Sequence, residues 1–210
     1  MKLIDMQVTG YLDMLASDAP APGGGSAAAF CGAQGIGLTT MVAGQTSIKA
    51  KYEADWPLCH KIMDEGKGLY EALTAQVDKD TDAYNLIAAA LKMPKTNDEE
   101  KAVRRKALAD ATLTATEVPF ETLRLAAKSL ELADMLLGHY NTNCASDLGV
   151  GGLNLHTCVH GAWLNVMINL GGVKDPEKAE FFEKEGKRLV AQSDEIAKRI
   201  QDTVNADILG

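Results

Sequence analysis

The feature that most restricts the fold is an unbroken helical repeat of apolar residues between Pro57 and Leu91. At about 100° per residue, these side chains fall in one narrow stripe, the pattern of an amphipathic helix with one buried face. Proline suits the first turn of such a helix, where its missing N–H leaves no helical bond unmade. The stripe consists of Leu58, Ile62, Leu69, Leu73, Val77, Tyr84, Ile87 and Leu91. We therefore expect one long helix over residues 57–91.

The rest of the sequence also indicates helices rather than strands. Thr96 and Glu99 form a capping-box pattern that opens a helix. Pro119 suits the start of the next helix, and Gly138 suits its end. Strand-like alternation of useful length is absent from the sequence. The remaining expected helices cover residues 3–16, 26–47, 146–172 and 175–205. These patterns predict an all-α fold, a single-domain helical bundle of about six to seven helices that occupies residues 1–210.

An excess of acidic residues limits the partners of this chain. The formal net charge is -8, with 29 Asp and Glu residues against 21 Lys and Arg residues. Such a surface repels nucleic acids and anionic membranes, so we expect neither as a partner. Residues 1–15 carry acidic and polar side chains where an export signal carries an apolar block. We expect a cytoplasmic protein whose cysteines, Cys31, Cys59, Cys144 and Cys158, are free thiols.

One acidic residue interrupts the apolar stripe of the long helix. Asp80 falls in the middle of the stripe, whereas Asp78 and Asp82 point to the opposite side and look like solvated acids. A carboxylate on a buried face is costly unless it is paired or its pKa is raised by desolvation. This is the profile of a general acid or base. A structural aspartate, paired with a lysine or capping a neighbouring helix, fits the pattern equally well.

The glycine-rich stretch "APAPGGGSAAAF" at residues 19–30 marks a place where backbone comes close to another group. It lacks the GK[ST] ending of a phosphate-binding loop, and no strand precedes it. A glycine turn that leads into a helix N-terminus presents N–H groups to a carboxylate or carbonyl, and Ser26 lies near this cap. The alternative is a tight helix crossing at which glycine only avoids a clash.

A polar seam follows one side of residues 146–172, a segment that is otherwise apolar nearly all round and reads as a central buried helix. Asparagine amides both donate and accept hydrogen bonds, and glycines leave room between them, which suits a flat heterocycle. The alternative is that these amides bond to one another within the core. The seam consists of Asp147, Gly151, Asn154, Cys158, Gly161, Asn165 and Asn169.

A metal site is not expected from the sequence. His156 and His160 lie four residues apart on one helical face. A zinc enzyme needs a third ligand and usually a glutamate between the two histidines, which is missing here. Cys158 lies on a different face from both histidines.

Four separated motifs together resemble the cyclodeaminase/cyclohydrolase family. They are "APAPGGGSAAA", "VDKDTDAYN" with "KMPKTNDEEKAVRRKA", "VPFETL", and "NTNCASDLGVGG" running into "NVMINL", in the family's order and over nearly the whole chain. The family includes the C-terminal domain of formiminotransferase-cyclodeaminase and the stand-alone methenyltetrahydrofolate cyclohydrolases of bacteria. The resemblance implies an all-helical homodimer and a tetrahydrofolate derivative as substrate. It also implies chemistry at the one-carbon unit between N5 and N10, with no tightly bound cofactor or metal.

The resemblance also implies roles for particular residues. The family's catalytic aspartate lies in the segment matched by "VDKDTDAY", which leaves Asp78 and Asp80 as candidates, and the helical projection favours Asp80 as general base. The glycine loop is expected to close over the pterin or the one-carbon unit. Lys49, Lys51 and the cluster at residues 104–106 are candidates for the glutamate tail of the folate. The other expected substrate-binding residues are Gly23, Gly24, Gly25, Ser26, Asp147, Asn154, Asn165 and Asn169.

Two reactions stay open at this point, because both pass through a tetrahedral carbon that bears nitrogen. In one, formiminotetrahydrofolate cyclises and loses ammonia; in the other, water opens the methenyl ring. Two non-enzymatic alternatives are a folate-binding or channelling dimer without turnover and a purely structural helical dimer. A buried acid argues against the first alternative, and the asparagine seam with the glycine loop argues against the second.

Overall fold

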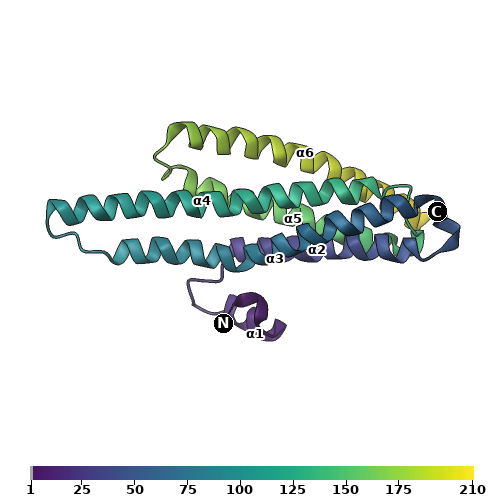
Figure 1. The fold of residues 1–210 in the computed structure, drawn as a ribbon, viewed down its shortest axis with the longest axis horizontal. Coiled ribbons are helices and arrows are strands. Elements are labelled where there is room, and N and C mark those ends of the chain that lie inside the picture. Colours follow the sequence, from purple (N-terminus) through teal and green to yellow (C-terminus); the bar gives the residue numbers. More distant parts are fainter. Residues whose placement is uncertain (1) are drawn as a thin grey trace.

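In the computed structural model, which describes residues 2–210, the chain forms six α-helices and three short 3-10 helices (Figure 1). No strand occurs among these residues, which confirms the all-helical prediction. The α-helices are α1 Val8–Leu15, α2 Gly24–Ser47, α3 Trp56–Lys92, α4 Asp98–Met135, α5 Ala145–Leu170 and α6 Pro176–Leu209. The 3-10 helices are η1 Leu3–Asp5, η2 Ala50–Asp55 and η3 Thr142–Cys144.

Helices α2, α3, α4 and α5 form the body of an elongated bundle. Helix α2 packs against α3 and α5, and α4 packs against the same two helices. Helix α6 covers α4 and α5. Helix α1 packs on the side of the bundle through Tyr11, which is buried in one cluster with Ala29 of α2 and Val77 of α3, and the glycine-rich loop joins α1 to α2 (Figure 1). The tip of the α3–α4 hairpin projects beyond the other helices (Figure 1).

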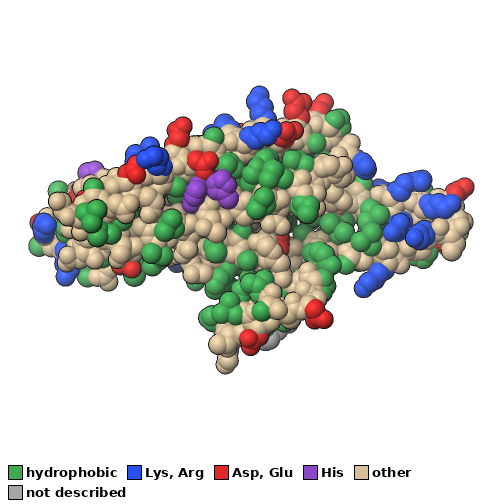
Figure 2. Space-filling view, turned by 180° about the vertical axis from the view of Figure 1, so that it is seen from behind, with side chains coloured by type: hydrophobic (Ala, Val, Ile, Leu, Met, Phe, Trp, Pro, Cys, Tyr) green, Lys and Arg blue, Asp and Glu red, His purple; other side chains and the backbone are tan. Residues whose placement is uncertain are grey.

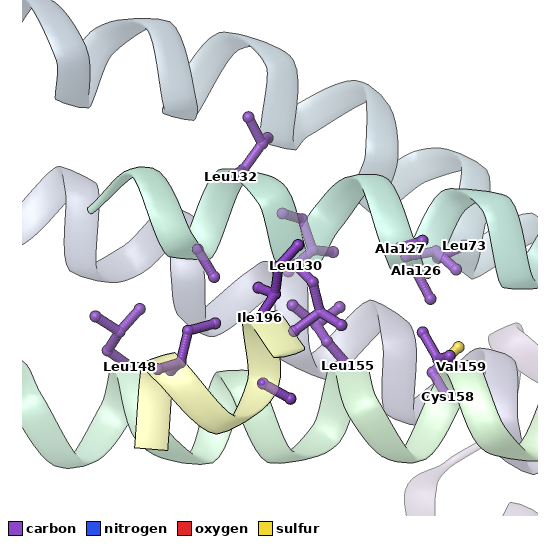
Figure 3. Packing of buried hydrophobic residues seen from close by; sticks show 14 of the residues in the cluster. Leu73, Ala126, Ala127, Leu130, Leu132, Leu148, Leu155, Cys158, Val159 and Ile196 are labelled. Carbon is purple, nitrogen blue, oxygen red and sulfur yellow. The ribbon is translucent and has the colours of Figure 1, made fainter. Parts of the chain in front are cut away.

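The core lies where the facing stripes of these helices meet. Leu73 of α3, Leu130 of α4 and Leu155 of α5 are each 0% exposed, and Ile196 of α6 closes the same cluster (Figure 3). The stripe predicted on α3 is therefore buried in its N-terminal part, where Ile62, Leu73 and Val77 have almost no exposure. Towards its C-terminal end the stripe emerges, because Tyr84 is 39% and Leu91 is 54% exposed.

Helix α2 is the one helix within residues 2–210 that is long and apolar enough to cross a membrane. Half of the 18-residue apolar segment of α2 is buried, and the helix packs against both α3 and α5. These contacts are those of a core helix in a bundle.

Several predicted helix ends are confirmed, and one cap is displaced. Gly138 follows α4 with a φ of +79°, a conformation that glycine adopts readily. The predicted capping box is shifted by one residue: the N-cap of α4 is Asn97, whose side chain accepts a hydrogen bond from the Glu100 N–H at 2.8 Å. The carboxylate of Glu100 in turn accepts from the N–H of Thr96 at 2.8 Å. Thr96 and Glu99 are therefore not the capping pair.

Pro119 does not start a helix, contrary to the prediction. It lies inside α4, which runs without a break from Asp98 to Met135. The single helix predicted over residues 3–16 is also wrong, because these residues form two separate helices, the short η1 and α1. The helix predicted to begin near residue 175 is confirmed as α6, whose N-cap Asp175 accepts from the N–H groups of Glu177 and Lys178.

Helix α5 is less buried than its composition predicts. Its inner side packs on α2, α4 and α6, but large apolar side chains remain on its outer side. Hydrophobic side chains accordingly spread across the middle of the face shown in Figure 2. The exposed apolar residues of α5 are Val150, Leu153, Leu164, Met167 and Ile168.

Candidate active site

The N-terminus of α2 is built around the carboxylate of Asp80. Gly23 is the N-cap of α2, and the backbone N–H of Ser26 donates to Oδ2 of Asp80 at 2.9 Å. The Ser26 hydroxyl donates to the carbonyl of Val77 at 2.7 Å and lies 3.2 Å from the same Oδ2. A carboxylate is favoured at this end of a helix because the unpaired N–H groups and the helix dipole both attract negative charge.

The contact with Asp80 also explains why one residue of the glycine run has no side chain. A Cβ atom on Gly25 would lie 1.9 Å from Oδ1 of Asp80, far inside van der Waals contact. A Cβ on Gly24 would meet Asn165 at an ordinary 3.6 Å, and one on Gly23 would have no described atom within 4 Å. The backbone therefore approaches Asp80 most closely at Gly25. At Gly23 and Gly24 there is room for a Cβ atom, so close packing does not require glycine there.

Burial changes the acidity of this carboxylate. Desolvation raises the pKa of Asp80 above its ordinary value of 3.8, and the two hydrogen bonds from Ser26 oppose this rise only in part. A carboxyl group whose pKa is shifted towards neutrality holds and releases a proton more readily under working conditions. The site therefore contains a group suited to proton transfer.

Asp80 lies at a cleft of about 320 Å³ between the N-terminus of α2 and helices α3, α4 and α5. Clefts of this size accept small molecules. The walls are mostly apolar, with amide groups from α5 and exposed backbone from the loop. The lining residues are Pro20, Ala21, Gly23, Gly24, Gly25, Asp80, Ala83, Tyr84, Ile87, Ala115, Asn165, Ile168 and Asn169.

Only the C-terminal end of the predicted polar seam reaches this cleft. Asn165 and Asn169 line it, whereas Asn154 lies eleven residues before Asn165, about 16 Å along the helix axis. Asp147 lies still farther away, in the first turn of α5. The structure therefore does not bring Asp147 and Asn154 to Asp80.

The middle of the seam forms a close crossing of α2 and α5. A Cβ on Gly151 would lie 3.1 Å from the carbonyl oxygen of Gly35, and one on Gly161 would lie 2.8 Å from the Cβ of Ala28. A Cβ on Gly32 would likewise meet the sulfur of Cys158 at 2.7 Å. This part of the seam is therefore a close helix contact, which is neither the ligand groove nor the set of mutually bonded amides that the sequence suggested.

Asn169 has a structural partner as well as a place in the cleft. Its Nδ2 donates to the carbonyl of Ala115 at 2.9 Å. In a regular helix that carbonyl would accept from the N–H of residue 119, but Pro119 has none. The amide of Asn169 replaces the missing donor, which explains how α4 continues through a proline.

We expect Asn169→Leu to lower the free energy of unfolding by about 1–3 kcal/mol, because it leaves the buried Ala115 carbonyl without a donor. In a Pro119→Ala background the backbone N–H returns, so the same substitution should cost much less. Urea denaturation of the wild type, both single variants and the double variant measures this difference. An equal cost in both backgrounds would show that the bond does not compensate for the proline.

Asp78 is not the solvated acid that the helical projection predicts. Its Oδ1 accepts a hydrogen bond from the backbone N–H of Leu3 at 2.6 Å, and the side chain is half-buried. Asp78 thus attaches the N-terminal segment to α3, and it is absent from the cleft lining. Asp82 is exposed, as predicted.

The lysines predicted for the glutamate tail are far from the cleft. Lys49 and Lys51 follow the C-terminal end of α2, and that helix has 24 residues, which is about 36 Å of helix between them and Gly24. The structure does not bring Lys51 to Asp80 within one chain. The other predicted cationic cluster, residues 104–106, lies on the protruding part of α4, where Lys and Arg side chains gather in Figure 2.

That second cluster borders a groove next to the cleft. Arg105, Lys106 and Lys174 line the groove, whose volume is about 580 Å³, together with Thr112 and Gly172. Thr112 lies three residues before Ala115 on α4, and Gly172 lies three residues after Asn169, so both walls continue from the cleft. Arg104 instead turns to the end of α3, where it donates to the carbonyl of Leu91 at 3.3 Å.

The structure adds residues that the sequence interpretation missed. Tyr84 and Ile87 belong to the apolar stripe that the sequence predicts to be buried, yet they line the cleft one and two turns beyond Asp80. Tyr11 of α1 is buried, and its hydroxyl has no hydrogen-bond partner among the described residues. Burial is the largest cause that raises the pKa of the Tyr11 phenol, and the nearby Cys31 and Asp80 raise this pKa further. The apolar position of Tyr11 in its helix concealed this proximity.

Comparisons with known proteins agree with this architecture. A profile of the family described as formiminotransferase-cyclodeaminase matches residues 7–188. A methenyltetrahydrofolate cyclohydrolase from Methylorubrum extorquens is 37% identical over 201 residues, which is 94% of this chain and 95% of that protein. A formimidoyltransferase-cyclodeaminase from Gallus gallus is 32% identical over 198 residues, covering 94% of this chain but 36% of that protein. The crystal structure of a formiminotetrahydrofolate cyclodeaminase from Thermotoga maritima has the same fold, with a TM-score of 0.86, 24% identity and coverage of 97% and 98% of the two chains.

Proposed function

Because this chain belongs to the formiminotransferase-cyclodeaminase family, it is an enzyme of folate one-carbon chemistry, and we propose that it hydrolyses 5,10-methenyltetrahydrofolate to 10-formyltetrahydrofolate. The observation that carries the proposal is the half-buried Asp80 at the cleft, held by Ser26 at the start of α2. The relative named methenyltetrahydrofolate cyclohydrolase is 37% identical to this chain, compared with 32% and 24% for the two relatives named cyclodeaminases, which favours hydrolysis over the cyclodeaminase reaction.

In the proposed reaction, Asp80 serves first as base and then as acid. The ionised carboxylate removes a proton from water as the water oxygen bonds to the cationic bridging carbon. Asp80 then returns this proton to N5 as the bond between the carbon and N5 breaks. The remaining hydroxyl proton leaves as the formyl group forms on N10. A pKa raised by burial suits both steps.

The rest of the cleft fits a reduced pterin. The amide groups of Asn165 and Asn169 can face the donor and acceptor edge of the ring, and the exposed backbone at Gly23 and Gly24 can follow its face. The apolar wall at Ile87 suits the flat ring system. We also propose that the enzyme needs no tightly bound cofactor for this reaction and that it acts in the cytoplasm.

Cyclodeamination of formiminotetrahydrofolate is the second candidate, since formimidoyltransferase-cyclodeaminases are also relatives. There N10 would attack the formimino carbon, and Asp80 would pass a proton from N10 to the departing ammonia. Measuring kcat/KM for both substrates with one preparation separates the candidates. Loss of methenyl absorbance faster than in buffer supports hydrolysis, and a rise in this absorbance with ammonia release supports cyclodeamination. Tight binding without either change would support the non-catalytic folate-binding dimer.

We further propose that the groove beside the cleft holds the glutamate tail. Replacing Arg105 and Lys174 together by glutamine should raise KM for a polyglutamylated substrate by about 5-fold or more and leave kcat unchanged, since each exposed ion pair contributes modestly. Lys51→Gln is the matched control and should behave like the wild type. Equal effects on monoglutamylated and polyglutamylated substrates would place the tail elsewhere.

We also propose that the protein forms a homodimer through the outer side of α5. Val150, Leu153, Leu164 and Ile168 fall on one side of α5 and are 48%, 51%, 62% and 81% exposed, an apolar stripe typical of a protein interface. Ile168 also lines the cleft, so a partner on this stripe would border the substrate site.

Light scattering should give about twice the chain mass of 22.4 kDa for the wild type. The substitution Leu164→Glu should give the chain mass itself, because it introduces a charge into the interface. Leu209→Glu, at an exposed position in the last turn of α6, is the control and should remain dimeric. A wild type of single-chain mass would contradict the dimer.

A further inference from the structure

Three metal-ligating side chains meet between α5 and α6, outside the residues that line the cleft. His156 and His160 lie one turn apart on α5, and Asp194 faces them from α6. The Nε2 atoms of both histidines lie 2.7 Å from the same Oδ1 of Asp194 and 3.1 Å from each other. All three ligand atoms are thus mutual neighbours, the arrangement in which one ion can touch them all.

The two 2.7 Å distances to Asp194 are hydrogen-bond lengths, but the 3.1 Å between the two Nε2 atoms is close to the separation of two ligand atoms on one ion. Ligand atoms around tetrahedral zinc lie about 2.0–2.2 Å from the metal, and therefore roughly 3.3 Å from one another. A small outward movement of Asp194 would satisfy these distances. Without a cation, two ring nitrogens lie in contact and compete for a single carboxylate oxygen. Two histidines at i and i+4 on a helix are a recurrent zinc-binding pair.

We propose that His156, His160 and Asp194 bind a divalent transition-metal ion, zinc or nickel, with water completing the coordination. Imidazole and carboxylate are suitable ligands for such ions. The side chains are 34%, 45% and 49% exposed, which leaves a path for the ion and room for a fourth ligand. The adjacent histidine side chains are open to solvent, with an acidic side chain beside them, on the face shown in Figure 2. The sequence did not reveal Asp194 as the third ligand, because Asp194 lies 34 residues after His160, on another helix.

The proposed ion has a structural role, because its ligands come from two helices. It would join α6, which covers the core through Ile196 and Ile200, to α5, which carries Asn165 and Asn169 into the cleft. The reaction of Asp80 does not involve this site. Metal binding should therefore increase the stability of the helix pair and affect turnover only indirectly.

The test is calorimetric titration of zinc chloride into the full chain, without an affinity tag and after treatment with EDTA. We expect one equivalent per chain, and a rise in Tm of about 5 °C at zinc concentrations 100-fold above Kd. The variants His156→Gln, His160→Gln and Asp194→Asn should each weaken binding by about 10-fold or more. His139→Gln is the matched control, since His139 is also exposed and bonds one carboxylate, Oδ1 of Asp55 at 2.8 Å.

Two results would overturn the proposal. One is the absence of stoichiometric zinc binding by the wild type. The other is unchanged binding by the three ligand variants, with circular dichroism confirming that they fold. Cobalt substitution provides a second readout: imidazole and carboxylate ligation gives visible d–d bands, whereas strong thiolate charge-transfer bands in the near ultraviolet would assign the ion to cysteine instead.

Discussion

The substitution Asp80→Asn should lower kcat by about 10²- to 10⁴-fold while the protein still folds. Asparagine keeps an oxygen that can accept from the Ser26 N–H at the start of α2, so the local structure survives. It cannot take a proton from water or return one to N5, so proton transfer is lost. Steady-state rates with methenyltetrahydrofolate, together with circular dichroism of both proteins, measure the effect.

Two neighbouring acids serve as controls for this experiment. Asp82→Asn changes an exposed carboxylate, and Asp78→Asn preserves an acceptor for the Leu3 N–H, so both variants should retain activity. Loss of turnover in Asp78→Asn with normal turnover in Asp80→Asn would exchange the assignments of the two acids.

The raised pKa of Asp80 predicts opposite pH dependences for stability and activity. The folded protein binds this proton more tightly than the unfolded chain, so its stability falls as pH rises from about 3.8 through the raised pKa. The Tm of Asp80→Asn relative to the wild type should therefore increase over this interval and then level off. Activity should rise over the same interval, because the base must be ionised. A constant Tm difference across this range would contradict a shifted carboxyl group.

Gly25→Ala should be nearly as damaging as loss of the aspartate, although it removes no functional group. Its new Cβ would lie 1.9 Å from Oδ1 and 2.4 Å from Cγ of Asp80, so either the carboxylate or the first turn of α2 must move. We expect a fall in kcat of about 10²-fold or more, because displacement of a catalytic group by about 1 Å is costly. The Tm should fall as well, since overpacking destabilises by about 1–3 kcal/mol.

Gly23→Ala is the matched control within the same loop. No described atom lies within 4 Å of a Cβ at that position, and its φ of -130° is accessible to alanine. This variant should keep its Tm and its kcat, and any change should be confined to KM, because Gly23 lines the cleft but does not contact Asp80. Similar losses in the two variants would attribute the effect to loop flexibility rather than to contact with Asp80.

The periodicity of the sequence was sufficient for the long helix α3 and for the inward direction of Asp80, but not for the unbroken course of α4 through Pro119. A repeat of about 100° per residue determines which side of a helix a residue occupies. It does not determine where along its neighbour that residue lies. Asn154 and Asn165 therefore looked equivalent, although only Asn165 lies level with the start of α2.

The remaining errors have similar causes. Thr96 and Asn97 are both good cap residues with a glutamate three positions later, so local pattern could not choose between them. The bond that ties Asp78 to Leu3 spans 75 residues. Contacts at such separations, like that of Asp194 with the two histidines, depend on how the helices assemble rather than on any one segment.

The bond between Asn169 and the Ala115 carbonyl has an evolutionary consequence. A proline at position 119 is tolerated only while another helix supplies the donor it lacks, so the two positions should change together among homologues. In a homologue with a different residue at 119, the carbonyl regains its own helical donor. The amide at 169 is then released, and selection there can act on substrate preference alone.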